Sequence, residues 1–420
     1  MFLGTLAKSF KRLPQDHVIF KRLAYIICQP NASSDWFGFT EQALNAIYAL
    51  AEHPDVVAGA IVKQVSKTIF YLSQSDIDGV EDLTKSLSET LALNGNGAPI
   101  ESSDNMQTEQ ASLAYPNSDK ASDLSKLFFL VGHVAVKQIV HLEAIEAEWK
   151  RRRHAKQTET REKKPASDLE QVAGTVEDEF VERIMEVRER ELLFGEKSLL
   201  ALFGPMIKQV CIQQELFKDD VLQIMATLAL CKFMCVSSQF CEANLPMLFA
   251  ILEHTKNPII RSNAIIGLGD MTISFNALID EHISSLYNCL NDSDSNVKKN
   301  TLMVLTFLIL NGMVKVKGQI SEMAKCIENP DKRISDLAKL FFSELSTKDN
   351  AIYNNLPDLI SNLSTVDEDT YRNITKFLFE FIKKVIFHCI LPSAHYDIMV
   401  FLHCMVCCIA AIGKTIRESH

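Results

Sequence analysis

The chain has 420 residues, 47% of them hydrophobic, which is enough apolar material for a large core and excludes a chain that is disordered throughout. Its 15 glycines and 12 prolines are too few for an all-β protein with many tight turns. The net charge of −10 argues against strong stand-alone binding of nucleic acid, although local basic faces remain possible.

The cysteines give no sign of a secreted, disulfide-bonded protein. The 11 cysteines follow no regular framework spacing, and no apolar signal segment precedes Pro14. We therefore expect reduced thiols in the cytosol or nucleus.

Residues 1–72 are predicted to form N-terminal helical repeats. Apolar side chains recur at helical spacing in three stretches, 16–29, 36–51 and 56–72. Residues 73–123 are dominated by polar residues and glycine and have weak apolar periodicity, so we expect a flexible polar insertion there. Residues 124–149 return to a strong helical pattern.

A run of basic residues follows this helix. Residues 150–164 contain eight Lys or Arg against two Glu, and the run opens with Lys150, Arg151, Arg152 and Arg153. The run has two interpretations: a nuclear-localisation or phosphate-contacting patch, or a solvated helix end. The second interpretation, which we favour, leads into a basic and charged linker over residues 150–176.

Residues 177–384 are predicted to form a helical-repeat solenoid. A turn followed by a basic residue and an apolar helical stripe occurs at 257–264, 294–301 and 330–338. The three occurrences align on Ile260, Val297 and Ile334, at intervals of 37 residues each time (297 − 260 and 334 − 297). A fixed period near 40 residues is typical of HEAT and armadillo repeats, which are stacked helix pairs. The predicted fold class is therefore all-α, a HEAT/armadillo-type solenoid with a disordered insertion.

The turns of these repeats are predicted to cap the second helices and to carry cations. Asp294 and Asp331 are placed to accept hydrogen bonds from free helix amides. Repetition of the turns would place their basic residues along one ridge, which could contact DNA or an acidic partner. Ordinary solvated turn residues are the alternative. The candidate ridge residues are Arg261, Lys298, Lys299, Lys315, Lys317, Lys332 and Arg333.

A second group of residues in the repeat is predicted to serve packing. Gly267 and Gly269 lie in the middle of a helix, follow no strand and lack a third glycine, so they favour close helix packing over nucleotide binding. Asn263 and Asp270 belong to the same motif, and Arg261 is expected to pair with Asp270 or with the preceding turn. No catalytic, cofactor or metal site is predicted, and we expect a non-enzymatic protein.

The residues within the repeats resemble those of one protein family. Asn-Pro-Ile-Ile-Arg-Ser-Asn-Ala-Ile-Ile-Gly-Leu-Gly-Asp-Met at 257–271 closely resembles the best-marked segment of condensin's HEAT-repeat subunits. The stretches 313–324, 337–346 and 350–364 look like the condensin I version, the condensin complex subunit 1 family, rather than the condensin II version. The resemblance covers roughly residues 15–384. Family members are much longer, so we expect a fragment or truncated form.

The resemblance implies a scaffold that acts in mitotic chromosome condensation and is not an enzyme. Its implied partners are the kleisin subunit of condensin, the SMC ATPase subunits, and DNA or chromatin. Its implied location is the nucleus and mitotic chromosomes, with a cytoplasmic pool. An importin-like or adaptin-like transport or coat protein is the alternative, because those proteins share the architecture.

The likeness stops after Lys384, and residues 385–420 form a divergent apolar tail rich in Cys and His. The tail could derive from an alternative or mis-assigned exon without a role, be a genuine end that caps the last repeat, or anchor the chain in a membrane. A bilayer span needs about 20 apolar residues, and Ile398–Gly413 has 16 with His403 inside, so no membrane partner is expected. A metal site would need more than the Cys-x-x-Cys spacing of His403, Cys404, Cys407 and Cys408.

Overall fold

The computed structural model describes residues 12–29, 35–70, 118–161, 179–315, 319–348, 351–363 and 366–390. Within these ranges the regular structure is helical, and the one pairing of extended backbone is an isolated β-bridge between Leu13 and Ala51. The all-α prediction is therefore confirmed. The chain divides into two compact units, residues 1–283 and 284–420, which we describe in turn.

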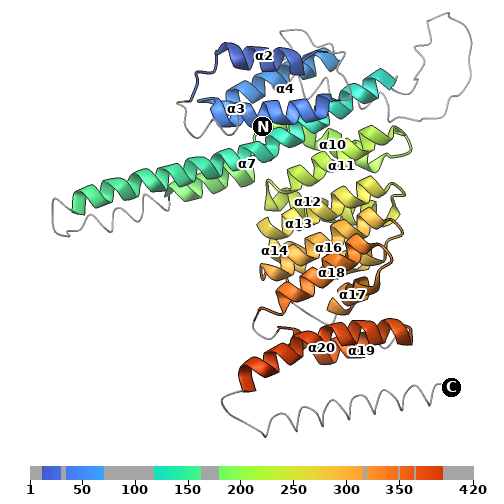
Figure 1. The fold of residues 1–420 in the computed structure, drawn as a ribbon. Coiled ribbons are helices and arrows are strands. Elements are labelled where there is room, and N and C mark those ends of the chain that lie inside the picture. The colour runs from blue at the N-terminus through green and yellow to red at the C-terminus, as the bar shows by residue number, and fades with distance from the viewer. Residues whose placement is uncertain are drawn as a thin grey trace, which may run out of the picture. The chain divides into compact units, whose positions relative to one another are not determined.

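The first unit begins with three helices that match the three predicted stretches. They are α2 (Val18–Ile27), α3 (Trp36–Leu50) and α4 (Pro54–Phe70), and α3 and α4 pack on the long helix α7 (Ser118–Arg161) (Figure 1). Trp36 fastens this group, because its ring lies 6.2 Å from that of Phe129 on α7 while its Nε1 donates to the Ile27 carbonyl at 3.1 Å.

Helix α7 is longer at both ends than the predicted 124–149. It begins at Ser118, inside the segment predicted to be an insertion, and Ala121 in its first turns is buried. It continues through 150–161, which we had assigned to a linker. Ion pairs within the helix account for this extension, since Lys150 binds Glu146 at 2.6 Å one turn away. Residues 71–117, including the rest of the predicted insertion, lie outside the described residues.

The rest of the first unit stacks short helices beside α7. Residues 179–186 are helical and are followed by a π-helical turn, Val187–Glu191. The elements that follow are α9 (Leu192–Phe194), a 3-10 turn (Leu200–Leu202), α10 (Phe203–Ile212), α11 (Asp220–Met234), α12 (Ser238–His254), α13 (Pro258–Ser274) and α14 (Asn276–Asp280). Helix α11 is central, because it packs on α7, α10 and α13.

The second unit repeats a pair of helices. In chain order its elements are α15 (Ile283–Asn288, beginning at the last residue of the first unit), the 3-10 turn Cys289–Asn291, α16 (Ser295–Leu310), α17 (Ile320–Lys325), the 3-10 turn Cys326–Glu328, α18 (Lys332–Leu345), α19 (Ala351–Leu363) and α20 (Glu368–Ile390). The second helices α16 and α18 pack side by side. A hydrogen bond also joins the first helices α15 and α17, since Gln319 Nε2 at the start of α17 donates to Ser284 Oγ at 2.7 Å.

The 37-residue interval marks buried positions, as predicted. Every residue of the three aligned sets is at most 3% exposed. The sets are Ile260, Val297 and Ile334; Ala264, Thr301 and Ala338; and Leu268, Leu305 and Phe342. Each of these residues therefore lies on the buried side of its own helix, which is α13, α16 or α18.

One helix among the described residues, Lys120–Ala155, is long and apolar enough by composition to cross a bilayer. Of its most apolar window, 44% is buried inside the protein, and the core helix of a soluble protein passes the same test. Residues 391–420, which hold the stretch weighed as a membrane anchor and the group His403, Cys404, Cys407 and Cys408, lie outside the described residues, while residues 385–390 belong to α20.

Candidate functional site

The repeat turns are built by side-chain caps. Asp294 Oδ1 accepts hydrogen bonds from the amides of Asn296 and Val297 at 2.8 and 3.1 Å, and Asp331 Oδ1 accepts one from Arg333 at 2.9 Å. Both aspartates have extended backbone and open a helix, so the predicted capping is confirmed. The caps satisfy free amides and fix the direction in which the first residues of α16 and α18 leave the turn.

Four cations follow the two caps in the second unit. We define them as the basic ridge: Lys298 and Lys299 in the first two turns of α16, and Lys332 and Arg333 in the first turn of α18. Lys332 and Arg333 are exposed, and the two lysines on α16 are half-buried. Within the described part of the chain none of the four forms an ion pair, so their charge is available to an anionic partner.

The other candidate ridge residues do not belong to this group of four. Arg261 lies in the first unit and is half-buried, and its Nη1 donates to the Thr255 carbonyl at 3.0 Å in the preceding turn. This is the second of the two pairings we predicted for it, and it gives Arg261 a scaffold role. Lys315 is exposed, and Lys317 lies outside the described residues.

The packing motif lies where α13 meets α11. A Cβ added at Gly267 would come within 2.7 Å of Cys231 Cβ and 2.8 Å of its Sγ, so only glycine permits this approach. Gly269 is buried, while Asn263 is half-buried and Asp270 is exposed. Nearby helices still remove enough water from Asp270 to raise the pKa of its carboxyl. These positions support the packing interpretation of the glycines and bring no nucleotide-binding group together.

The basic run on α7 differs from the ridge because three of its first four cations form ion pairs. Glu148 accepts hydrogen bonds from Arg151 at 2.8 Å and from Arg152 at 2.7 Å, and these bonds lower the pKa of Glu148 to about 2. Lys150 binds Glu146, and the guanidinium of Arg153 lies 5.2 Å from the centre of the Trp149 ring. We call Lys150–Arg153 the α7 patch; its charges stabilise the helix that carries them.

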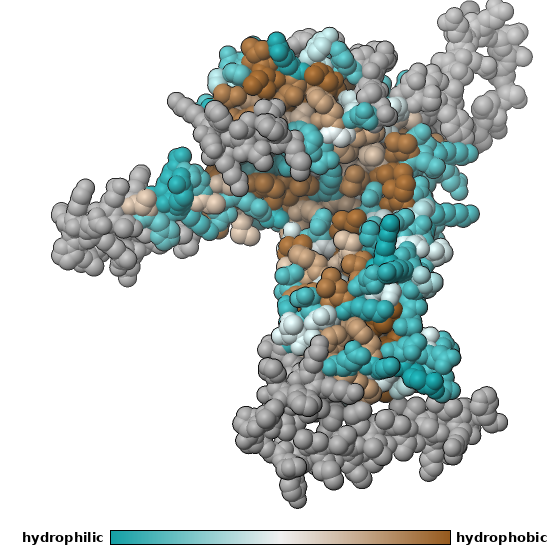
Figure 2. All heavy atoms as spheres, viewed as in Figure 1, coloured by the Kyte–Doolittle hydropathy of each residue, from teal (hydrophilic) through white to brown (hydrophobic). Residues whose placement is uncertain are grey.

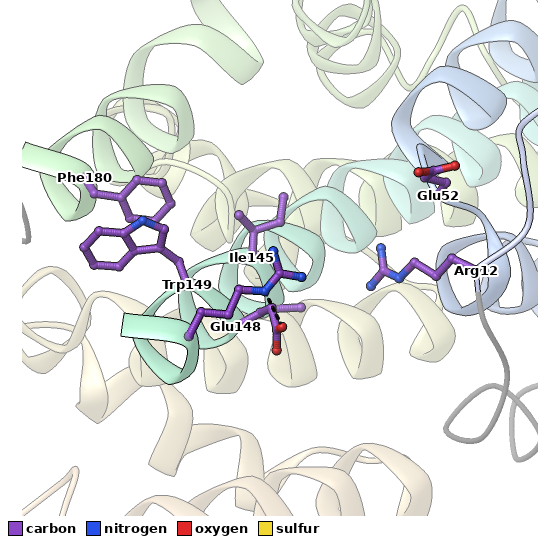
Figure 3. Close-up of a pocket in the computed structure, with 8 residues that line it drawn as sticks. Arg12, Glu52, Ile145, Glu148, Trp149 and Phe180 are labelled. Atoms are coloured by element: carbon purple, nitrogen blue, oxygen red, sulfur yellow. Dashed lines mark hydrogen bonds and ion pairs between the residues drawn. The ribbon is translucent and has the colours of Figure 1, made fainter. Parts of the chain in front are cut away.

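An open hollow lies beside this patch in the first unit (Figure 3). One wall is apolar, with Ile145 next to the stacked rings of Trp149 and Phe180, whose centres are 4.5 Å apart. Arg12 and Glu52 lie at its other side. Charges of both signs line the hollow, and this mixture selects no class of ligand.

The π-helical turn holds a contact that sequence reasoning missed. Arg188 donates from Nε to the Val236 carbonyl at 3.0 Å and from Nη2 to the Cys235 carbonyl at 3.3 Å, at the end of α11. Glu189 accepts hydrogen bonds from the amide and hydroxyl of Ser238 at 2.7 and 2.9 Å, at the start of α12. Arg188 and Glu189, which are adjacent, thus cap the end of α11 and the start of α12. In the sequence the pair reads as ordinary charged helix surface.

The described cysteines are not arranged for nucleophilic or metal chemistry. Burial raises the pKa of Cys211 and Cys235 to about 12 and that of Cys231 well above its ordinary value, which is opposite to what a thiolate nucleophile needs. No group of three or more metal-ligating side chains is found among the described residues. The fold therefore defines a helical-repeat protein of the HEAT class.

Comparisons with known proteins identify the family. The family model described as non-SMC mitotic condensation complex subunit 1 matches residues 259–386. Condensin complex subunit 1 of Saccharomyces cerevisiae is 39% identical over 386 residues, covering 88% of this chain and 30% of that protein. The Schizosaccharomyces pombe protein is 41% identical over 384 residues (88% and 32%), and the Homo sapiens protein is 37% identical over 392 residues (89% and 26%).

The chain belongs to the condensin complex subunit 1 family and spans about a third or less of the length of these relatives. The resemblance seen in the repeats is thereby confirmed. A solved engineered protein overlaps 44% of this chain and 81% of its own with 14% identity and a TM-score of 0.29, too low a similarity to support an argument.

Proposed function

We propose that the chain is a section of the non-catalytic HEAT-repeat scaffold of a condensin complex and acts in mitotic chromosome condensation. The observation that carries the proposal is the identity of 37–41% to condensin complex subunit 1 over about nine-tenths of the chain. The buried cysteines agree with a structural role, since their raised pKa keeps the thiols protonated.

The proposed partners are the kleisin subunit, the SMC ATPase subunits and DNA. The basic ridge supports an anionic contact, because its four cations cluster at two adjacent helix starts and have no carboxylate partner in the described part of the second unit. The proposed location follows from this role: the nucleus and mitotic chromosomes, with a cytoplasmic pool. The relatives named above favour condensin over the transport or coat proteins that share the architecture.

Co-purification tests the assignment. The chain in its natural full-length context, tagged and isolated from mitotic cells, is expected to bring down SMC and kleisin subunits in stoichiometric amounts. Recovery of nuclear-transport or vesicle-coat components, with no SMC subunit, would contradict the proposal.

A further inference from the structure

The 37-residue interval also marks exposed apolar side chains. Ile266 on α13 is 44% exposed, Met303 on α16 is 49% exposed and Leu340 on α18 is 56% exposed. The intervals between them are again 37 residues (303 − 266 and 340 − 303). The repeat therefore keeps an apolar residue on the outside of each second helix as well as on the inside, and packing of the core explains only the inside.

Two of these positions lie on neighbouring helices of the second unit. Phe307 lies one turn after Met303 on α16 and is 48% exposed, and Leu340 lies on α18, which packs beside α16. We call Met303, Phe307 and Leu340 the apolar stripe. Figure 2 shows apolar side chains among the hydrophilic ones over this part of the molecule. The exposed area of the three is on the order of 300 Å², about the size of the largest apolar patch on an ordinary monomer, which is often functional.

The core does not require these residues. The inner side of α16 is supplied by Leu302 and Leu305, and that of α18 by Phe341 and Phe342, all fully buried. A lysine or glutamate at the stripe would leave those contacts intact and would favour a solvated helix. The apolar choice at equivalent positions therefore points to a surface that is covered in use.

The basic ridge adjoins the stripe on the same two helices. Lys299 lies one turn before Met303 on α16, and Lys332 and Arg333 lie two turns before Leu340 on α18. Charge thus gathers at the N-terminal ends of α16 and α18, and the apolar side chains lie further along both helices. Nucleic acid has a charged backbone that suits the ridge, but it has no apolar group to cover Phe307 and Leu340.

We infer that the apolar stripe and the basic ridge together bind an acidic, amphipathic segment of a partner protein. Its apolar side chains cover the stripe, and its carboxylates face the ridge. The ridge then fixes orientation and raises the association rate, while the stripe supplies the buried contacts. The inference rests on the proposed function, because the segment is expected to come from another subunit of the same complex.

Site-specific crosslinking tests the inference. The change Phe307→p-benzoylphenylalanine is made in the full chain within the reconstituted complex, and irradiated products are mapped by mass spectrometry. The expected product joins position 307 to a partner segment that contains both apolar and acidic residues. A crosslink to DNA, to a second copy of the chain or to its own residues 391–420 would overturn the inference, as would no crosslink in an intact complex.

Substitution on the stripe gives a second measurement. Phe307→Ser and Leu340→Ser are expected to weaken binding of a synthetic peptide spanning the crosslinked segment by about tenfold or more each. The control Val140→Ser removes an apolar side chain that is 51% exposed on α7, and it should leave the affinity unchanged. Equal affinities for all variants would refute the inference. Retained co-purification with SMC subunits in that case would leave the proposed function standing.

Discussion

The contact between α11 and α13 depends on the absence of a side chain at Gly267. In Gly267→Ala the new Cβ would lie 2.7 Å from Cys231 Cβ, which is fixed to the backbone of α11 and cannot rotate away. The two helices must therefore separate. Overpacking of this kind costs about 1–3 kcal/mol. Replacing glycine by alanine inside a helix contributes about 1 kcal/mol in the opposite direction. We expect a net loss of about 1–2 kcal/mol because the clash involves atoms held by both backbones.

A matched control has the opposite sign. Gly59 lies inside α4, and a Cβ added there would meet nothing within 4 Å. Gly59→Ala is therefore expected to stabilise the first unit by about 0.5–1 kcal/mol, through helix propensity alone. The two variants share the same chemical change, so their difference isolates the steric term.

Hydrogen exchange resolves the effect locally. Amides of α11 and α13 should exchange faster in Gly267→Ala than in the unaltered chain, while amides of α4 should exchange more slowly in Gly59→Ala. Urea unfolding of both variants gives the overall free energies. Slower exchange of α11 and α13 in Gly267→Ala would show that the helices tolerate the added methyl group, and the packing argument would then be wrong.

Three further results are expected. Asp294→Ala and Asp331→Ala should each cost about 1 kcal/mol and speed amide exchange in the first turns of α16 and α18, whereas Asp336→Ala, which removes no cap, should not. Replacing all four ridge cations by Glu should weaken and slow binding of the acidic partner segment and reduce the salt dependence of its affinity, whereas reversing the α7 patch should change them less; unchanged affinity at low salt would remove the ridge from consideration. Burial, and then the charges of Lys232 and Lys137, lower the pKa of His133 to about 3. The neutral side chain therefore makes its full contribution to the free energy of unfolding above the unfolded-state pKa near 6.5, and this contribution is lost as the pH falls toward 3. Stability should drop by about 1 kcal/mol per pH unit below 6.5, and His133→Gln should flatten that fall in urea unfolding; an unaltered profile would contradict the assignment.

The repeat was readable from the sequence because its physical requirements are local and periodic. Ile260, Val297 and Ile334 had to be apolar to fill equivalent core positions, and Asp294 and Asp331 had to accept amides at equivalent helix starts. Both requirements therefore recur at a fixed spacing of 37 residues along the sequence. Interval and residue type together then predicted the buried positions and the caps of α16 and α18.

Contacts between distant segments left no such signal. Gly132 on α7 approaches Ala229 on α11 so closely that an added Cβ would lie 3.0 Å from the Ala229 Cα, yet a lone glycine in an apolar helix does not reveal its partner. The end of α7 was placed too early because Lys150 and its neighbours were read as linker charges. Their pairing with Glu146 and Glu148 becomes decisive only when the helix is formed.

The way α3 and α4 pack on α7 has a consequence for how the chain can be divided. Residues 71–117 connect α4 to α7 in sequence, but the helices on both sides of that connection meet directly through Trp36 and Phe129. Noncovalent contact, rather than the connection, then holds residues 12–70 in place. A chain cut between Phe70 and Ser118 should therefore reassemble from its two fragments.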